Sequence, residues 1–252
     1  MNNTIHTFWI GGPLDELSWL SLSSFVKHGF QVNLWCYQPL LHKVPEGVTL
    51  RDAAEILPEQ EIFQHVNGSW APFSDWFRFA LLYKEGGLWV DTDIICLKPF
   101  TVPDNTICGE EYGKPSIGFI SMQKGHALAK ELMLACEDPR TAPLYDNIVR
   151  QIVHSIMINL SKEDARRRAP WSYSGNDILQ QEFKKYSWCE LPPCDVYPIK
   201  YPDAINLVNG VATLEQIKDS KCVHLWRSVL RRRDPQFTDS CLYNQLKQLT
   251  LD

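Results

Sequence analysis

Two carboxylates one residue apart interrupt an otherwise apolar, strand-forming segment between Gly86 and Phe100. The segment reads GGLWVDTDIICLKPF, and Asp91 and Asp93 are its acidic residues. In an extended chain alternate side chains point to the same side, so both carboxylates can aim one way while Thr92 points back. Two carboxylates at a strand end offer the oxygen ligands that Mg²⁺ and Mn²⁺ prefer, together with the phosphates of a substrate. A pair of solvated loop aspartates is the alternative, and D-x-D alone does not decide between the two.

A pair of opposite charges precedes this segment. Asp75 and Arg78 stand three residues apart in SDWFRFALLYK, so on a helix they share a face. One interpretation is a surface ion pair of little energetic weight. The other is a grip on a substrate, with Asp75 on sugar hydroxyls and Arg78 on a hydroxyl or phosphate oxygen, because both groups form several directed hydrogen bonds.

The elements expected around these residues alternate between strand and helix. Apolar, strand-forming runs predict extended segments at 4–10, 31–36, 48–50, 88–90, 106–108, 117–122, 196–199 and 221–226. Helical spacing predicts helices at 14–27, 52–57, 74–84 (with Ser74 as the N-cap), 127–136, 144–160, 177–186 and 238–251. This alternation favours an α/β domain around a doubly wound, mostly parallel sheet. Ligands of such sheets bind beyond the carboxyl ends of the strands, where Asp91 and Asp93 are expected.

Composition narrows the class of protein. The chain has 252 residues, 44% of them hydrophobic, as in a soluble globular domain, and its net charge of −5 argues against nucleic-acid binding. The start, MNNTIHTFWIGG, shows no secretory signal, and no apolar run approaches the ~20 residues that span a bilayer. The eight cysteines are scattered without C-x-x-C, which favours reduced thiols. These features predict a cytoplasmic protein.

The segment SDWFRFALLYKEGGLWVDTDI (residues 74–94) closely resembles the signature S-D-x-x-R-x-x-x-L-x-x-x-G-G-x-Y/W-x-D-x-D of DXD-containing sugar-nucleotide glycosyltransferases. The nearest group is glycosyltransferase family 32, which includes fungal initiating α-1,6-mannosyltransferases and α-1,4-galactosyltransferases. The glucosyltransferase domains of large clostridial toxins are more distant relatives. The resemblance implies a GT-A fold over residues 1–252 as a single domain. Residues 1–100 would form the nucleotide-sugar half, and 101–252 the acceptor side and the C-terminal closing segment.

Two further segments carry the resemblance. IHTFWIGG (residues 5–12) is similar to the family's opening strand, I-H-x-x-W-x-G, which lines the nucleoside pocket. This similarity implies that Trp9, Ile10 and Gly11 contribute to donor binding, with core packing as an equal alternative for Trp9.

VHLWRS (residues 223–228) matches the family's closing H-x-W segment. By that likeness His224 is a third metal ligand or a neighbour of the diphosphate, and Trp226 and Ser228 contribute to the donor site. A structural histidine within an apolar strand is the alternative.

The stretch from about 101 to 220 is only loosely similar to the family. Where relatives often show Gly-Pro, this chain reads Ser174-Gly175-Asn176-Asp177. Asn176 and Asp177 are therefore candidates for acceptor or catalytic roles, with a helix N-cap turn as the alternative. Of the two arginine clusters, 166–168 is expected to be a solvated face. For Arg231–Arg233, a solvated face, a pyrophosphate contact and contact with an anionic membrane that carries a lipid-linked acceptor stay open.

Together, the resemblance implies metal-dependent, retaining transfer of a hexosyl group from a nucleoside-diphosphate sugar to a saccharide hydroxyl. The predicted metal ligands of Mn²⁺ or Mg²⁺ are Asp91, Asp93 and His224, while Asp75 and Arg78 hold the transferring sugar. A UDP-hexose with galactose is the favoured donor. The favoured setting is bacterial surface-polysaccharide synthesis in the cytoplasm, or at the inner membrane face. Alternatives are a non-catalytic sugar- or nucleotide-binding protein of the same fold, and an effector that glycosylates a host protein.

Overall fold

The computed structural model describes residues 3–38, 44–109, 115–139, 164–169, 178–233 and 237–251, together with residues 149, 152, 155 and 156. Most of the predicted helix at 144–160 lies outside these residues. The candidates Asn176 and Asp177 also lie outside them.

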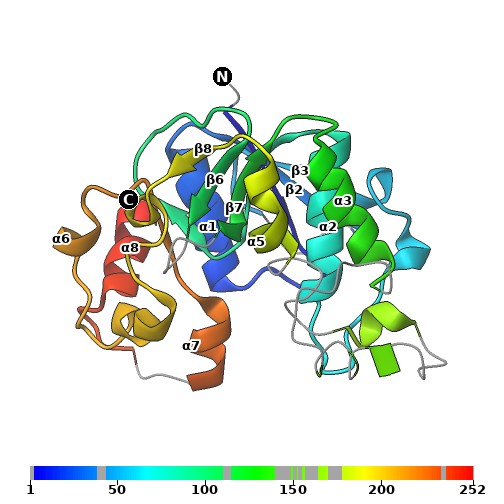
Figure 1. Cartoon of the computed structure of the whole chain (residues 1–252). Helices are drawn as coiled ribbons and strands as arrows, with labels where there is room; N and C mark the ends of the chain where they lie inside the picture. The colour runs from blue at the N-terminus through cyan, green and yellow to red at the C-terminus, as the bar shows by residue number, and fades with distance from the viewer. Residues whose placement is uncertain are drawn as a thin grey trace.

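A mixed sheet forms the centre of the molecule (Figure 1). In the described part of the chain its seven strands run in the order β3-β2-β1-β4-β7-β6-β8. Pairs β1–β2, β1–β4, β2–β3 and β6–β8 are parallel, whereas β7 is antiparallel to β4 and β6. The mixed, mostly parallel α/β sheet predicted from the sequence is therefore confirmed. The strands are β1 (Thr4–Phe8), β2 (Gln31–Cys36), β3 (Val48–Asp52), β4 (Gly87–Val90), β6 (Thr106–Gly109), β7 (Pro115–Met122) and β8 (Cys189–Leu191).

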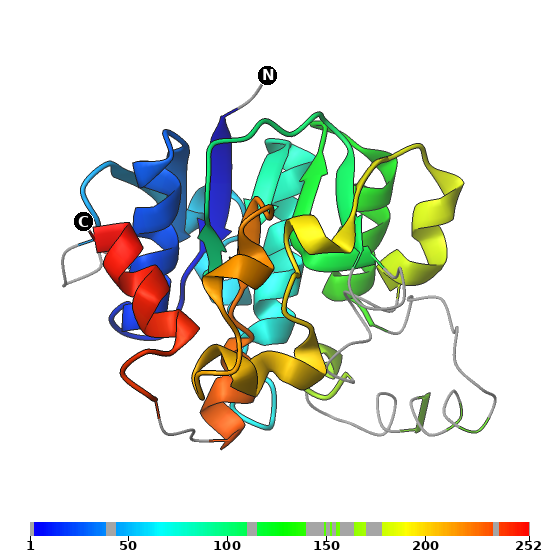
Figure 2. The same cartoon turned by 90° about the vertical axis from the view of Figure 1, so that its left-hand side faces the viewer.

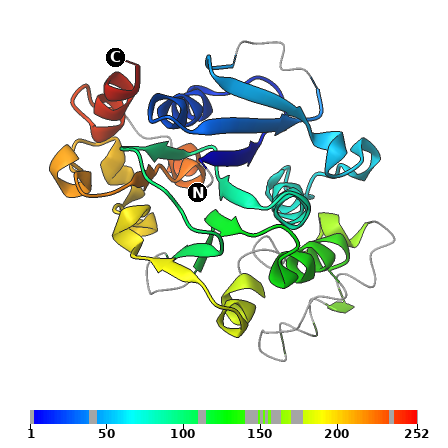
Figure 3. The ribbon, with the colours of Figure 1, turned by 90° about the horizontal axis from the view of Figure 1, so that it is seen from above.

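Helices cover both faces of this sheet, α1 and α8 on one side and α2 and α3 on the other (Figure 3). Each side has its own cluster of buried apolar residues. The α-helices whose bounds the structure describes are α1 (Glu16–Lys27), α2 (Ala71–Lys84), α3 (Ala127–Glu137), α5 (Ile178–Glu182), α6 (Leu214–Ile217), α7 (Arg227–Arg233) and α8 (Leu242–Leu251). Short 3₁₀ helices occur at Ala53–Glu55, Glu59–Glu61, Ala165–Arg167, Phe183–Lys185, Pro193–Asp195 and Tyr201–Leu207.

A separate two-stranded sheet joins the aspartate segment to a strand near the C-terminus. Strand β5 (Ile94–Cys96) follows the aspartate pair directly, and it pairs antiparallel with β9 (Cys222–His224). Its register places Ile94 opposite His224. The last predicted strand, at 221–226, therefore lies beside the aspartate segment and outside the main sheet. Because β1 runs downward in Figures 1 and 2, the carboxyl ends of β1 and β4 face the lower side, where α7 lies.

A stripe of buried serines on α1 holds β5 in place. Asp15 caps the helix by accepting a hydrogen bond from the Ser18 amide over 2.8 Å. One turn later the Ser21 hydroxyl donates to the Ile94 carbonyl over 2.7 Å, and the Ser24 hydroxyl accepts from the Cys96 amide over 2.9 Å. These hydroxyls provide hydrogen-bond partners for the backbone groups of β5 that do not pair with β9. Helix α1 therefore fixes the position of β5 and of the aspartate segment that precedes it.

Helix α2 begins one turn earlier than predicted. Its N-cap is Trp70, and Ser74 lies inside the helix, so the prediction of Ser74 as the N-cap is wrong. Pro72 in the first turn explains the earlier start, because proline is preorganised for that position and lacks only an amide that the helix would leave unpaired. The helix ends before Gly86, whose φ of +70° and 2.5 Å approach of a would-be Cβ to the Lys124 amide nitrogen require glycine.

The prediction of an extended segment at 196–199 is also wrong. Residues 193–195 form a 3₁₀ turn, and the strand of this region is β8, a few residues earlier. Pro192, Pro193 and Pro198 explain the difference, since a proline cannot donate to a strand ladder.

Candidate active site

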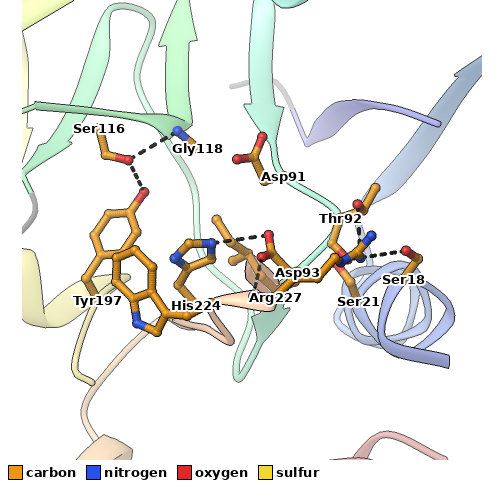
Figure 4. Close-up of polar contacts among 12 residues, drawn as sticks. Ser18, Ser21, Asp91, Thr92, Asp93, Ser116, Gly118, Tyr197, His224 and Arg227 are labelled. Atoms are coloured by element: carbon orange, nitrogen blue, oxygen red, sulfur yellow. Dashed lines mark hydrogen bonds and ion pairs between the residues drawn. The ribbon is translucent and has the colours of Figure 1, made fainter. Parts of the chain in front are cut away.

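The two aspartates lie on a tight turn at the carboxyl end of β4 (Figure 4). The Asp91 amide still pairs with the Gly118 carbonyl over 2.9 Å, as an extension of the β4–β7 ladder. The Ile94 amide then donates to the Asp91 carbonyl over 3.2 Å, which closes a turn. The segment from Asp91 to Asp93 is therefore not extended, and the two carboxylates are positioned by different neighbours.

Asp91 is held through one of its two oxygens. Oδ1 accepts hydrogen bonds from Trp89 Nε1 and from Arg78 Nη2, each over 2.7 Å. Oδ2 lies on the side of Gly118, where a Cβ on that glycine would come within 3.0 Å of it. The side chain is 29% exposed, so Asp91 is oriented by buried donors and still reaches the surface of the site.

Arg78 bridges two carboxylates in the interior. Its Nη1 donates to Asp75 Oδ1 over 3.0 Å and its Nη2 to Asp91, and its side chain is only 4% exposed. The guanidinium also lies over the Trp89 ring, with 4.8 Å between Cζ and the ring centroid. The alternative of a surface ion pair is therefore wrong. Arg78 Nε is buried and has no hydrogen-bond partner among the described residues, so one donor of the guanidinium is unsatisfied.

Asp75 is the most strongly perturbed acid of this group. Burial raises the pKa of Asp75 to about 6, the nearby charge of Asp91 adds to the rise, and Arg78 opposes it. Two carboxylates share one guanidinium, so the buried triad carries a net negative charge when both are ionised.

Asp93 is held by the closing segment of the chain. Its Oδ1 lies 3.2 Å from His224 Nε2, and its Oδ2 accepts from the Arg227 amide over 3.0 Å. Its carbonyl accepts from the Leu225 amide over 2.8 Å. Burial by itself would raise the pKa of Asp93, but its interactions with His224 and Arg227 hold that pKa below its ordinary value. Asp93 is therefore an anion in the folded protein.

The expected metal ligands are close together but do not form a ready-made cage. Asp93 and His224 are in direct contact, whereas Asp91 is tied to Arg78. Among the described residues no cluster of three histidine, cysteine, aspartate or glutamate side chains has the geometry of a metal site. Two carboxylates and one imidazole still suit Mn²⁺ or Mg²⁺, since such ions commonly take the rest of their ligands from substrate phosphates and water. The residues present fit a metal that arrives with its substrate.

The opening segment meets the closing segment beside this turn. The Trp9 indole is half-buried, its Nε1 donates to the Gly12 carbonyl over 2.9 Å, and the Arg227 guanidinium lies 5.2 Å from its ring centroid. Ile10 packs against the core. Gly11 has a φ of +92° and is exposed, and a Cβ there would lie 2.8 Å from Trp70 Nε1.

The other two predicted donor contacts differ in accessibility. Trp226 is buried, with its Nε1 on the Ile199 carbonyl (2.7 Å) and its ring 4.0 Å from that of His224. Ser228 is exposed on the first turn of α7. Trp226 thus packs under His224, and Ser228 faces outward.

The sequence does not predict several residues at this site. Tyr197 donates to Ser116 Oγ over 2.8 Å, the same oxygen accepts from the Gly118 amide over 3.2 Å, and the Tyr197 ring packs edge-on against His224 (Figure 4). No local sequence pattern predicts these contacts, because Tyr197 and Ser116 are 81 residues apart. Arg227 was inside the motif VHLWRS and could have been found there.

The arginine clusters have different surroundings. Arg166 donates hydrogen bonds to Asp164 and Glu61 and lies 5.0 Å from the Trp76 ring centroid, so the expectation of a solvated face is wrong for this residue. Arg167 and Arg168 are exposed, as expected. Arg231 is 67% exposed and pairs with Asp15 over 3.1 Å. Every helix within the described residues is too short or too polar to span a bilayer.

The sequence around this site matches a known protein family. Residues 35–113, which hold the Asp75–Arg78–Asp91 group and Asp93, match the glycosyltransferase sugar-binding region containing the DXD motif. The chain carries a DXD-type glycosyltransferase region. The predicted resemblance to DXD glycosyltransferases and the assignment to this enzyme class are thereby confirmed. The mixed sheet with a DXD turn at the end of β4 is the arrangement expected of a GT-A fold.

Individual relatives are distant. The chain is similar to lactosylceramide 4-alpha-galactosyltransferase of Pongo pygmaeus, with 24% identity over 220 residues that cover 78% of this chain and 88% of that protein. The Homo sapiens protein of the same name is also 24% identical over 220 residues, but these cover 54% of it, so the chain spans about half the length of that relative. Among solved structures, PaToxG glycosyltransferase aligns over 98% of this chain and 86% of its own, with 16% identity and a TM-score of 0.48.

Proposed function

We propose that the DXD glycosyltransferase region transfers a hexosyl group from a nucleoside-diphosphate sugar to a saccharide hydroxyl. The observation that carries this proposal is the buried bridge from Asp75 through Arg78 to Asp91, which ends at a partly exposed carboxylate two residues before Asp93. Burying three charged groups is costly, and a purely structural role gives no reason to keep them. A sugar, with its several hydroxyls, uses such a set of donors and acceptors.

In this proposal each residue has a separate task at the donor. Arg78 offers its unpaired Nε and Asp91 its Oδ2 to the transferring sugar, while Asp75 keeps the guanidinium in place. Trp9 forms one wall for the base. These contacts hold the anomeric carbon of the sugar within reach of the acceptor hydroxyl, and such positioning contributes strongly to the rate.

Departure of the diphosphate is the difficult step, since negative charge grows on the leaving oxygen as the bond to the sugar breaks. Asp93 and His224 are the proposed direct ligands of Mn²⁺ or Mg²⁺, and Asp91 is proposed to lie near the ion or to contact it through a water molecule. A divalent ion held there would supply electrostatic stabilisation of that charge. Asp93 is suited to this role because it is anionic and already oriented by three contacts from the closing segment.

The donor and acceptor are proposed at a finer level. UDP-galactose is the favoured donor, which agrees with the galactosyltransferase name of the curated relatives. Retention of the anomeric configuration follows from the family resemblance. The proposed setting is assembly of a bacterial surface polysaccharide in the cytoplasm, with residues 1–252 as one domain and contact of Arg231–Arg233 with the membrane face as an option.

The test is a donor panel of UDP- and GDP-sugars, each with and without Mn²⁺, read as release of free nucleotide and as a thermal shift. A bound donor should raise the melting temperature of the folded state. We expect Mn²⁺-dependent release of UDP from UDP-galactose and a smaller response to GDP sugars. No release from any donor, together with metal-independent glycan binding, would favour a non-catalytic sugar-binding protein.

A further inference from the structure

Arg227 joins two distant parts of the chain at the active site (Figure 4). Its Nη2 donates to Ser18 Oγ over 2.7 Å and to the Thr92 carbonyl over 2.8 Å, and Nη1 lies 3.5 Å from Asp15 Oδ2. The Ser18 hydroxyl donates to Asp15 over 2.7 Å, so its oxygen is oriented to accept from the arginine. The guanidinium therefore ties the start of α1 to the turn that carries the two aspartates.

The backbone around Arg227 holds the second of these aspartates. The Arg227 amide and His224 Nε2 each contact one carboxylate oxygen of Asp93, and the Leu225 amide binds its carbonyl. All three contacts come from four consecutive residues, 224–227. The direction of the Asp93 carboxylate is thus set by where this short segment lies.

The same segment holds an uncommon backbone conformation. Trp226 has a φ of +54°, which bulky residues rarely adopt. This conformation turns the chain from β9 into α7 and aims the Arg227 amide back at Asp93. A conformation of this kind persists only where surrounding contacts fix it, and the Arg227 side chain supplies several of them.

We infer that Arg227 is a positioning residue for donor binding, an inference that rests on the proposed function. Its guanidinium locks segment 224–227 onto α1 and the aspartate turn, which orients Asp93, and its cationic face lies against the Trp9 ring. Lysine cannot replace it, because a single ammonium cannot make these contacts and cover the ring at once.

The experiment compares Arg227→Gln and Arg227→Lys with the matched control Arg51→Lys. Arg51 also lies over an indole, that of Trp35, and pairs with Glu55, but it is on the edge strand β3. UDP affinity in the presence of Mn²⁺ is measured by calorimetry, and backbone hydrogen exchange is followed along the chain. Both Arg227 variants should bind UDP about tenfold or more weakly and exchange about tenfold faster at residues 91–97 and 222–230, because local opening controls both. The control should stay within about twofold of the wild type in both measurements.

Exchange also separates a positioning role from a general loss of stability. A global loss would speed exchange in every element, whereas the inference requires wild-type rates in α3. If Arg227→Gln does not fold, Ser18→Ala removes one acceptor and should shift exchange in the same two segments by a smaller factor.

The inference and the proposed function can fail separately. If the wild type binds UDP and neither Arg227 variant changes affinity or local exchange, the inference is overturned and the proposed function stands. If the wild type binds no nucleotide, the proposed function falls together with the role in donor binding. Faster exchange at 91–97 in the variants would then still support the positioning of Asp93.

Discussion

Replacing Asp75 by asparagine should stabilise the fold while it damages the donor site. Asp75 and Asp91 share Arg78 in the interior, and burial raises the pKa of Asp75 from 3.8 to about 6. Between these values the folded state binds more protons than the unfolded state, so Asp75 makes stability fall as the pH rises through this window. The difference is about two pKa units, and at about 1.4 kcal/mol a unit it corresponds to a penalty of about 3 kcal/mol above pH 6.

Asparagine has nearly the same shape, keeps an oxygen that can accept from Arg78 and carries no charge. Asp75→Asn should therefore be more stable than the wild type by about 1–3 kcal/mol at pH 8, and the gain should disappear near pH 4. Urea denaturation followed by circular dichroism across this pH range measures the difference. Glu55→Gln is the control, because Glu55 is an exposed acid paired with Arg51. The free energy of unfolding of this variant should stay within about 0.5 kcal/mol of the wild type at every pH. A destabilised Asp75→Asn at pH 8, or a gain that does not depend on pH, would refute the account of this buried triad.

Three further changes test other parts of the structure. His6 has the opposite pH dependence. Burial and the charge of Arg51 lower the pKa of His6 to about 4, so its imidazole stays neutral in the folded protein down to that pH. The free energy of unfolding should therefore decrease by about 3 kcal/mol as the pH falls from 6.5 to 4. His6→Asn should abolish that loss in the same urea titration, and an unchanged acid limb would contradict the assignment. Gly118→Ala places a methyl group 3.0 Å from Asp91 Oδ2 and 3.3 Å from the Tyr197 hydroxyl, so donor turnover should fall about tenfold or more in a nucleotide-release assay. Wild-type turnover in that variant would show that the donor does not use the space between Gly118, Asp91 and Tyr197. Ser24→Ala leaves the buried Cys96 amide without its acceptor and should lower the free energy of unfolding by about 1–3 kcal/mol in urea, whereas the neighbouring Ser23→Ala should cost less.

Local signals account for the parts of the fold that the sequence predicts well. Strand β2 begins and ends where its apolar run does, and α1 ends before Gly29, whose φ is +82°. The sequence misplaces the start of α2, because Ser74 resembles an N-cap, whereas Pro72 lies within the first turn and the N-cap is Trp70.

The aspartate pair shows where local reasoning stops. Strand alternation suggested that both carboxylates face one way, but the Ile94 amide closes a turn on the Asp91 carbonyl, and each carboxylate then finds its own partners. Asp91 is held by residues nearby in sequence, Arg78 and Trp89. Asp93 is held by β9 and α7, more than a hundred residues later, and no local pattern specifies that pairing.

The most direct test of the central claim is a titration of Mn²⁺ into the protein with UDP, followed by the electron paramagnetic resonance signal of the free ion. The wild type should take up one Mn²⁺ per chain only when UDP is present, because phosphates complete the ligand set that Asp93 and His224 begin. Asp93→Ala should fold and leave the ion in solution. Equal uptake by Asp93→Ala and the wild type would contradict the assignment of this turn as the site that holds metal and diphosphate.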